Sequence, residues 1–209
     1  MSGPPSLAGH PIVCLGFAEW DAELRTNQHH LMARLAQSSP VLFIESLGLR
    51  RPTASSRDLR RIVKRLLRGV RPLRRMGDVH VLSPLVIPFH GSRVVRAINR
   101  RLLSWAVRHA LRRLELRHPL VLWTYVPQGR ELIPILRPDL VVYHCVDDIA
   151  AHDRVDTEPF RRAEAELVRE ADLVITTAEP LRARLAEIAP GVMLMPNVAD
   201  TESFARALD

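Results

Sequence analysis

The chain has 209 residues, of which 47% are hydrophobic and 25% are charged, and this composition is typical of a soluble globular protein rather than a disordered one. The length accommodates one large domain or two small ones with a sizeable core. The segment from Met1 to His10 lacks the basic start of a secretory signal, and no segment approaches the roughly 18 apolar residues of a membrane span. We therefore expect a cytoplasmic protein.

The formal net charge of +7 conceals an uneven distribution. The segment from Arg57 to Arg117 has 17 basic and 3 acidic residues, and the rest of the chain has 13 basic and 20 acidic ones. A codon preference for arginine would explain the type of basic residue but not its clustering. The clustering predicts an anionic partner, either a membrane surface or a nucleic acid. Because the sequence has no nucleic-acid recognition motif, we favour the membrane and expect no nucleic acid as a partner.

The first part of the chain predicts two buried strands joined by a helix. The apolar run from Pro11 to Phe17 is the first strand, with Gly16 at its carboxyl end. A glycine there permits a tight turn or the close approach of a ligand, although the fingerprint G-x-G-x-x-G is absent. Trp20 and Arg25 follow in the loop before the helix. The second strand runs from Val41 to Glu45, which lies at its carboxyl end.

Two basic helices are predicted in the middle of the chain. One starts at about Arg57 with apolar residues at helical spacing and arginines opposite them. A strand from Val79 to Leu82 separates it from a second helix over Arg93–Arg117, which also carries Trp105. A solvated helix face is the alternative, but such a face normally mixes charge signs. We therefore expect Arg57–Arg75 and Arg93–Arg117 to contact an anionic membrane. The apolar stripe of the second helix includes Ile98, Leu102, Ala106 and Leu114.

The second half continues the alternation of strand and helix. Three strands are expected at Leu120–Tyr125, at Asp172–Thr177 and at Val192–Asn197, and a fourth begins at Leu140. The whole pattern predicts one α/β domain that is Rossmann-like, with a largely parallel sheet of about seven strands and helices on both faces. The two cysteines lie in strand candidates, where buried reduced thiols are expected, and no metal site is predicted. The cysteines are Cys14 and Cys145.

Polar side chains gather where the strand from Leu140 ends. Tyr143, His144, Asp147 and Asp148 follow its apolar run. In open parallel sheets, ligands bind in the crevice beyond the carboxyl ends of the strands. Two adjacent carboxylates do not belong in a core, so they either line a polar cleft or cap the next helix and face solvent. The spacing alone leaves both interpretations open.

Seven short segments, in order over nearly the whole chain, resemble one known family. The segments are Trp20 with Arg25 and His29–Leu31, Val41–Glu45, Leu82–Pro84, Leu122–Pro127, Val142–Asp148, Ala171–Thr177 and Met195–Phe204. Together they resemble the N-terminal half of bacterial GT-B glycosyltransferases, of the family 4 type that makes surface polysaccharides. The last segment is similar to the family motif P-N-G-V-D-x-x-x-F, with Val198 in place of the glycine.

The resemblance implies how the chain is organised and what it binds. Residues 1–196 would form the acceptor-side domain, and residues 197–209 would begin the linker to a C-terminal donor-binding domain that this sequence does not include. This half would bind a sugar or lipid-linked acceptor and no cofactor, because the nucleotide-sugar donor belongs to the other half. The activity would be glycosyl transfer in polysaccharide or glycolipid synthesis, peripheral at the inner face of the plasma membrane. The alternative is a non-catalytic module that binds a membrane or a partner.

The resemblance also suggests roles for the edge residues. Asp147 or Asp148 would accept the acceptor proton or orient its hydroxyl. His144 would contact the donor sugar, or would be a core histidine with its hydrogen bonds satisfied. The other substrate-binding candidates are the aromatic residues, which would stack on sugar rings or belong to the core, and the residues at the first two strand ends. They are Trp123, Tyr125, Tyr143, Gly16, Trp20, Arg25 and Glu45.

Overall fold

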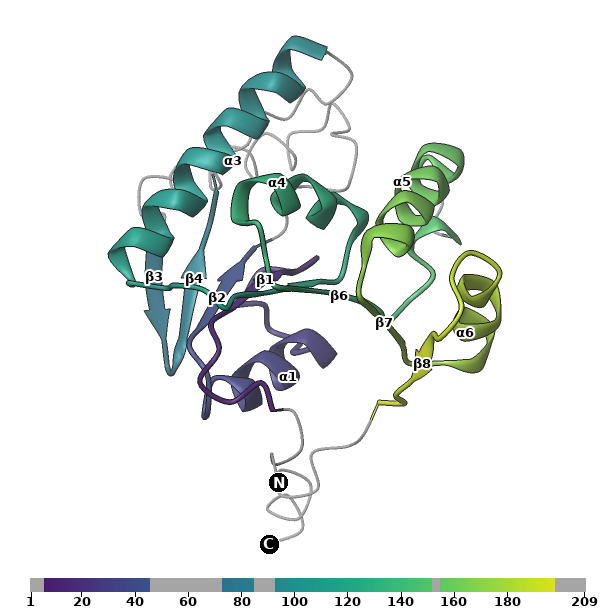
Figure 1. Cartoon of the computed structure of the whole chain (residues 1–209), viewed down its shortest axis with the longest axis horizontal. Helices are drawn as coiled ribbons and strands as arrows, with labels where there is room; N and C mark the ends of the chain where they lie inside the picture. The colour runs from purple at the N-terminus through teal and green to yellow at the C-terminus, as the bar shows by residue number, and fades with distance from the viewer. Residues whose placement is uncertain (1–5, 46–72, 85–92, 152–154, 198–209) are drawn as a thin grey trace, which may run out of the picture.

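The computed structural model describes residues 6–45, 73–84, 93–151 and 155–197. Within them the chain forms one sheet of eight strands with helices on both faces (Figure 1). The predicted α/β class is therefore confirmed. The strands are β1 (Ile12–Leu15), β2 (Val41–Ile44), β3 (Leu73–Met76), β4 (Val79–Leu82), β5 (Val121–Thr124), β6 (Leu140–Cys145), β7 (Leu173–Thr176) and β8 (Met193–Leu194).

The strand order makes the sheet Rossmann-like. The order is β3-β4-β2-β1-β5-β6-β7-β8, and every neighbouring pair is parallel except β3 with β4. Without the antiparallel β3, the first six parallel strands run in the order 3-2-1-4-5-6, which is the doubly wound arrangement. The order reverses between β1 and β5. In such sheets this switch point is where the ligand crevice opens, at the carboxyl ends of the two strands.

The strand that the sequence analysis missed is β3. The expectation was about seven strands, whereas the described part of the chain has eight. The residues of β3 are Leu-Arg-Arg-Met, and they are half-buried or exposed. An edge strand pairs on one side only, so it has no need of the continuous apolar run that marks the central strands.

Two helical layers cover the sheet. Helices α3, α4 and α5 lie on one side in Figure 1, and α1 lies on the other. Alternate residues of each strand face these two layers, so Val13 packs with α3 and its neighbours while Ile12 packs with α1. The helical elements are α1 (Asn27–Leu35), α3 (Arg93–Arg113), η1 (Pro127–Leu132), α4 (Ile133–Leu136), η2 (Ile149–Ala151), α5 (Thr157–Glu170) and α6 (Glu179–Ala186).

The two basic helices of the sequence analysis have different outcomes. The second is α3, which ends at Arg113 rather than Arg117. Its predicted apolar stripe is partly wrong, because Ile98 is 40% exposed and the core contacts come from Leu103, Val107 and their neighbours. The helix predicted from about Arg57 lies outside the described residues. No helix in the described ranges is both long and apolar enough to cross a bilayer.

One hydrogen bond joins segments far apart in the sequence. The side-chain amide of Asn27, the first residue of α1, donates to the side-chain oxygen of Asn197, which follows β8. The next residue of α1, Gln28, accepts a hydrogen bond of 3.0 Å from the backbone N–H of Phe17. The start of α1 is thereby held to both the loop after β1 and the segment after the last strand.

Candidate functional site

Gly16 and Tyr125 follow β1 and β5 at the switch point. Gly16 is not in a left-handed conformation; a Cβ there would overlap the ring of Phe43 and would lie 2.5 Å from Oε1 of Gln28. Glycine is needed at this position because the strand end packs tightly against two side chains. The structure thus gives Gly16 a packing role, where the sequence suggested a tight turn or a ligand contact.

Glu45 sits in a buried polar cluster at the end of β2. Its carboxylate accepts hydrogen bonds from the backbone N–H of Trp20 at 2.9 Å, from Arg74 at 2.9 Å and from the hydroxyl of Ser83 at 2.5 Å. The ring of Trp20 is 4% exposed and packs against Phe43. Glu45 and Trp20 are at the predicted edge, but they hold the ends of β1 and β2 together.

Arg74 and Arg25 complete this end of the sheet. Arg74 lies in β3 and also approaches Asp21 at 3.6 Å, so the missed strand supplies the counterion of Glu45. This part of the predicted membrane-binding segment is therefore an ion pair within the domain. Arg25 is exposed in the loop before α1, where a ligand at the edge could reach it.

Three aromatic side chains meet beside the switch point on the α1 face. The ring of His144 lies 5.8 Å from that of Trp123 and 5.1 Å from that of Tyr125, measured between ring centroids. All three residues are buried, with His144 fully so. We call them the aromatic cluster. They come from the ends of β5 and β6, as the sequence analysis predicted.

The ring nitrogens of His144 lack hydrogen bonds. Within the described part of the chain, no partner satisfies Nδ1 or Nε2 of His144. The indole N–H of Trp123 and the hydroxyl of Tyr125 interact with each other, but without the geometry of a full hydrogen bond. Unpaired buried polar atoms are rare because each costs free energy comparable to a lost hydrogen bond. His144 is thus buried in the core, as one of the two alternatives expected, but the described residues provide no hydrogen-bond partner for its ring. Burial lowers its pKa from 6.5 to about 4, so its ring is neutral near pH 7 and combines one donor with one acceptor.

Tyr143 faces the opposite way, because successive strand residues alternate between faces. Its hydroxyl donates a hydrogen bond of 2.7 Å to Glu164 of α5. Burial, with the neighbouring Cys145 and Glu164 acting in the same direction, raises the pKa of Tyr143 well above its usual value. Tyr143 is thus a core residue on the α5 side, separated by the sheet from the aromatic cluster.

Comparison with known proteins adds no family to this geometry. No family model matches the chain, and no curated protein matches it. The function is therefore inferred from the residues at the carboxyl edge of the sheet.

The two adjacent carboxylates have different surroundings. Asp147 is exposed, and its side chain accepts a hydrogen bond of 2.8 Å from the backbone N–H of Asp148 at the start of η2. Asp148 is half-buried and pairs with Arg161 of α5 at 2.7 Å. Asp147 therefore agrees with the solvent-facing alternative, whereas Asp148 is held by an arginine of α5, and the polar-cleft alternative stays a prediction.

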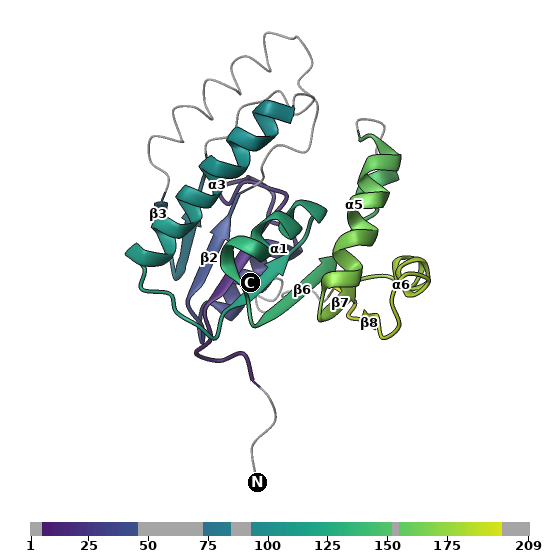
Figure 2. The ribbon, with the colours of Figure 1, turned by 45° about the horizontal axis from the view of Figure 1, so that its top comes forward.

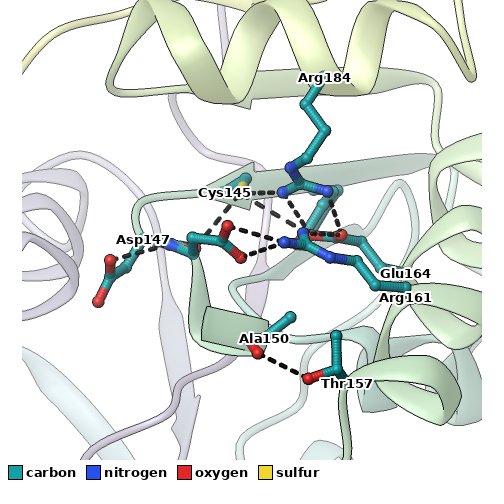
Figure 3. A network of polar contacts seen from close by, with 9 residues as sticks. Cys145, Asp147, Ala150, Thr157, Arg161, Glu164 and Arg184 are labelled. Atoms are coloured by element: carbon teal, nitrogen blue, oxygen red, sulfur yellow. Dashed lines mark hydrogen bonds and ion pairs between the residues drawn. The ribbon is translucent and has the colours of Figure 1, made fainter. Parts of the chain in front are cut away.

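Behind these carboxylates lies a polar network centred on Glu164 (Figure 3). The Glu164 side chain is 2% exposed and binds Arg184 at 2.5 Å and Arg161 at 3.3 Å, besides Tyr143. We call these residues with Cys145 the Glu164 network. Burial, and then the nearby carboxylate of Glu164, raise the pKa of Cys145 to about 11, so its thiol is protonated at neutral pH. Both cysteines are free and buried, as predicted.

The sequence analysis missed Glu164, although a signal was present. Glu164 occupies a position on the apolar face of α5, between Phe160 and Leu167, and all three are buried. A charged residue within an apolar stripe needs a buried partner. Arg161 lies one turn earlier on the same helix. Tyr143 and Arg184, however, lie about 20 positions away in either direction, and their proximity to Glu164 depends on the fold.

The described ranges contain no group of three or more His, Cys, Asp or Glu residues placed to hold a metal ion. Two shallow hollows are present on the surface, one against α5 at Arg162 and one at the amino end of the sheet near His10. Neither of these two is at the carboxyl edge, where the polar groups of the candidate site lie just beneath the surface.

Proposed function

We propose that the chain is the acceptor-binding half of a nucleotide-sugar-dependent glycosyltransferase acting at the cytoplasmic face of a membrane, in polysaccharide or glycolipid synthesis. The observation that carries the proposal is the aromatic cluster at the switch point. Sugars present hydroxyl groups and apolar ring faces together. The two unpartnered ring nitrogens of His144, beside the indole N–H of Trp123 and the hydroxyl of Tyr125, match both features.

The other half of the proposal concerns the donor. In the GT-B arrangement that the sequence resembles, the nucleotide binds a second Rossmann-like unit, and the reaction takes place between the two. The carboxyl edge of a sheet, with polar groups just beneath its surface, suits one wall of such a cleft. The donor-binding unit can be a further domain of the same protein or a separate subunit, and this half requires no cofactor.

Access to the aromatic cluster requires movement. His144 is 0% exposed and Trp123 is 5% exposed, so a sugar reaches their polar atoms only when side chains at the edge shift. We propose that acceptor binding is coupled to this opening, and that the bound hydroxyls then provide the missing hydrogen bonds. The free-energy gain from satisfying these atoms would offset the cost of opening.

The proposal predicts that sugars perturb Trp123 selectively in the isolated chain. In ¹H–¹⁵N spectra the indole N–H signals of Trp20, Trp105 and Trp123 can be assigned by replacing each with phenylalanine. Titration with methyl glycosides of common hexoses at millimolar concentrations should shift the Trp123 signal and leave that of Trp20 in place. His144→Phe should remove the shift. A Trp123 signal that stays fixed while the glycosides bind elsewhere would contradict the proposed sugar site.

Replacing each of the two carboxylates should have a different effect on the turnover of the complete enzyme. We assign acceptance of the acceptor proton to Asp147, because Asp148 is engaged with Arg161. Asp147→Asn is expected to reduce turnover about 100-fold, the usual contribution of a general base, with unchanged thermal stability. Asp148→Asn should lower turnover less and mainly weaken the contact with α5. Full turnover by both variants would exclude this edge from catalysis, and a larger loss in Asp148→Asn would reverse the assignment.

A non-catalytic binding module is the second candidate. The observation in its favour is that Asp148, Glu45 and Tyr143 all have structural partners, so much of the predicted site serves the fold. A module of this kind would leave the Trp123 signal unchanged in every glycoside titration. The titration therefore also separates the two candidates.

A further inference from the structure

Helix α3 has one face in the core. Leu103, Ala106, Val107 and Ala110 are at most 8% exposed and pack in the larger hydrophobic cluster. Because successive residues of an α-helix are rotated by about 100°, these four residues lie within a sector about 100° wide. This sector contains the fully buried part of α3, and Leu111 packs against the same cluster at its margin.

The opposite face is apolar as well as exposed. Val94 is 68% exposed, Ile98 is 40% exposed and Trp105 is 62% exposed. The same rotation places these three within about 40° of one another and on the far side from the core. The ring of His109 stacks against that of Trp105 with centroids 5.5 Å apart. These side chains project outward as a ridge, and large apolar residues gathered on one exposed face mark an interaction surface.

Arginines accompany the ridge. Arg101, Arg108 and Arg112 are exposed and lie in the same sector as Trp105. The sequence of α3 contains no acidic residue. The helix lies over the β3–β4 side of the sheet, away from α5 and α6 (Figures 1 and 2). The ridge and its arginines are therefore distant from the Glu164 network.

We propose that this face of α3 docks on an anionic lipid bilayer, with the helix lying flat along the surface. Trp105, Ile98 and Val94 enter the boundary between headgroups and acyl chains, and the arginines bind headgroup phosphates. Tryptophan favours this boundary, and long arginine side chains reach from it to the headgroups. The proposal deepens the membrane location given in the proposed function and rests on that part of it. Because it involves no residue of the aromatic cluster, vesicle binding and sugar binding can fail separately.

A lipid surface fits better than a nucleic acid because of the apolar ridge. From Val94 to Trp105 the ridge extends about 16 Å along the helix. A phosphate backbone would pair with the arginines but would leave these three side chains against a charged surface. A bilayer accommodates both kinds of side chain. The interaction is peripheral, as no described helix can cross a bilayer.

Trp105 is a built-in reporter for the test. Trp20 and Trp123 are 4% and 5% exposed, whereas Trp105 is 62% exposed, so a change in acrylamide quenching on binding reports Trp105. The full chain is mixed with phosphatidylcholine vesicles with or without phosphatidylglycerol. We expect co-sedimentation with the anionic vesicles only, a blue shift of the emission and protection from acrylamide. High salt should weaken the binding, because exposed charges are screened over about 10 Å at 0.1 M.

Two matched triple variants distinguish the contribution of the α3 face to vesicle binding from that of the protein's net charge. Replacing Arg101, Arg108 and Arg112 with glutamate should weaken vesicle partitioning at least about 100-fold, since each basic residue near an anionic surface contributes about fivefold. The control replaces three exposed arginines on α1 and α5, with the same change in net charge, and should retain most binding. The control residues are Arg34, Arg162 and Arg169. Circular dichroism verifies that both variants are folded.

Trp105→Ser tests the apolar part at unchanged charge and should reduce binding several-fold. Three results would overturn the proposal: equal losses in the two triple variants, a Trp105 that stays open to acrylamide on bound vesicles, or protection of Trp105 by a short DNA duplex but not by vesicles. Protection that depends on protein concentration without lipid would instead assign the ridge to a second copy of the chain, and would also overturn it.

Discussion

Replacing Glu164 with alanine is expected to destabilise the protein by about 3 kcal/mol, near the lower end of the range for breaking a buried ion pair. The carboxylate is 2% exposed and accepts from Tyr143, Arg161 and Arg184. Its removal leaves a buried hydroxyl and two guanidinium groups without their acceptor. The arginine side chains are 30% and 25% exposed, so water relieves part of the cost. Urea unfolding followed by circular dichroism measures the effect.

The same helix provides the control. Glu166 pairs with Arg130 at 2.7 Å, and both side chains are 44% exposed. Glu166→Ala should therefore cost less than about 1 kcal/mol, as exposed ion pairs do. Glu164→Gln keeps an acceptor and should fall between the two alanine variants. If Glu164→Ala were no more destabilising than Glu166→Ala, the Glu164 network would not contribute to holding α5 on the sheet.

Acidification from neutral pH to about pH 4 is expected to remove up to about 3 kcal/mol of stability through His144 alone. Above pH 6.5 the imidazole is neutral in both the folded and the unfolded chain, so it makes no difference. Between pH 6.5 and about pH 4, His144 is protonated in the unfolded chain but stays neutral in the folded chain, because burial lowers its pKa in the folded chain to about 4. Stability is lost through this window and the loss levels off below it, at about 1.4 kcal/mol for each unit between the two pKa values.

Urea unfolding of the wild type and of His144→Phe across this pH range measures the contribution. The phenylalanine variant should lose less stability on acidification. His30→Asn is the control, because His30 is exposed on α1 and its removal takes away a histidine without changing the buried ring. An identical pH dependence in the wild type and His144→Phe would mean that His144 is protonated in the folded protein, and therefore that it has an acceptor.

The sequence predicted those parts of the fold that depend on local pattern. β6 is an apolar run buried on both faces, and its position in the sheet places His144 and Asp147 near the carboxyl edge as expected. β3 lacks such a pattern. Its pairing with β4 depends on a turn and on the placement of Arg74 against Glu45, which is 29 residues away. Contacts of this kind become visible only after the sheet has formed.

The sequence identified candidate residues for the site, but not how their side chains are arranged on the two faces of the sheet. Alternation along β6 alone puts Tyr143 and His144 on opposite faces. Which face is next to the ligand edge depends on the strand order and on the helix that covers each side. For the same reason the predicted apolar stripe of α3 includes Ile98, since several apolar residues of this helix fit a helical stripe but only those around Val107 are fully buried against the sheet.

The hydrogen bond between Asn27 and Asn197 has a mechanical consequence. The sheet connects β1 to β8 through its intervening strands, and this bond connects Asn197 directly to the start of α1. Gln28 in the same turn of α1 accepts from the backbone after Gly16. The first turn of α1 therefore connects the segment after β8 with the end of β1 by two side-chain hydrogen bonds that do not pass through the sheet, and replacing Asn27 would remove one of them and leave the other.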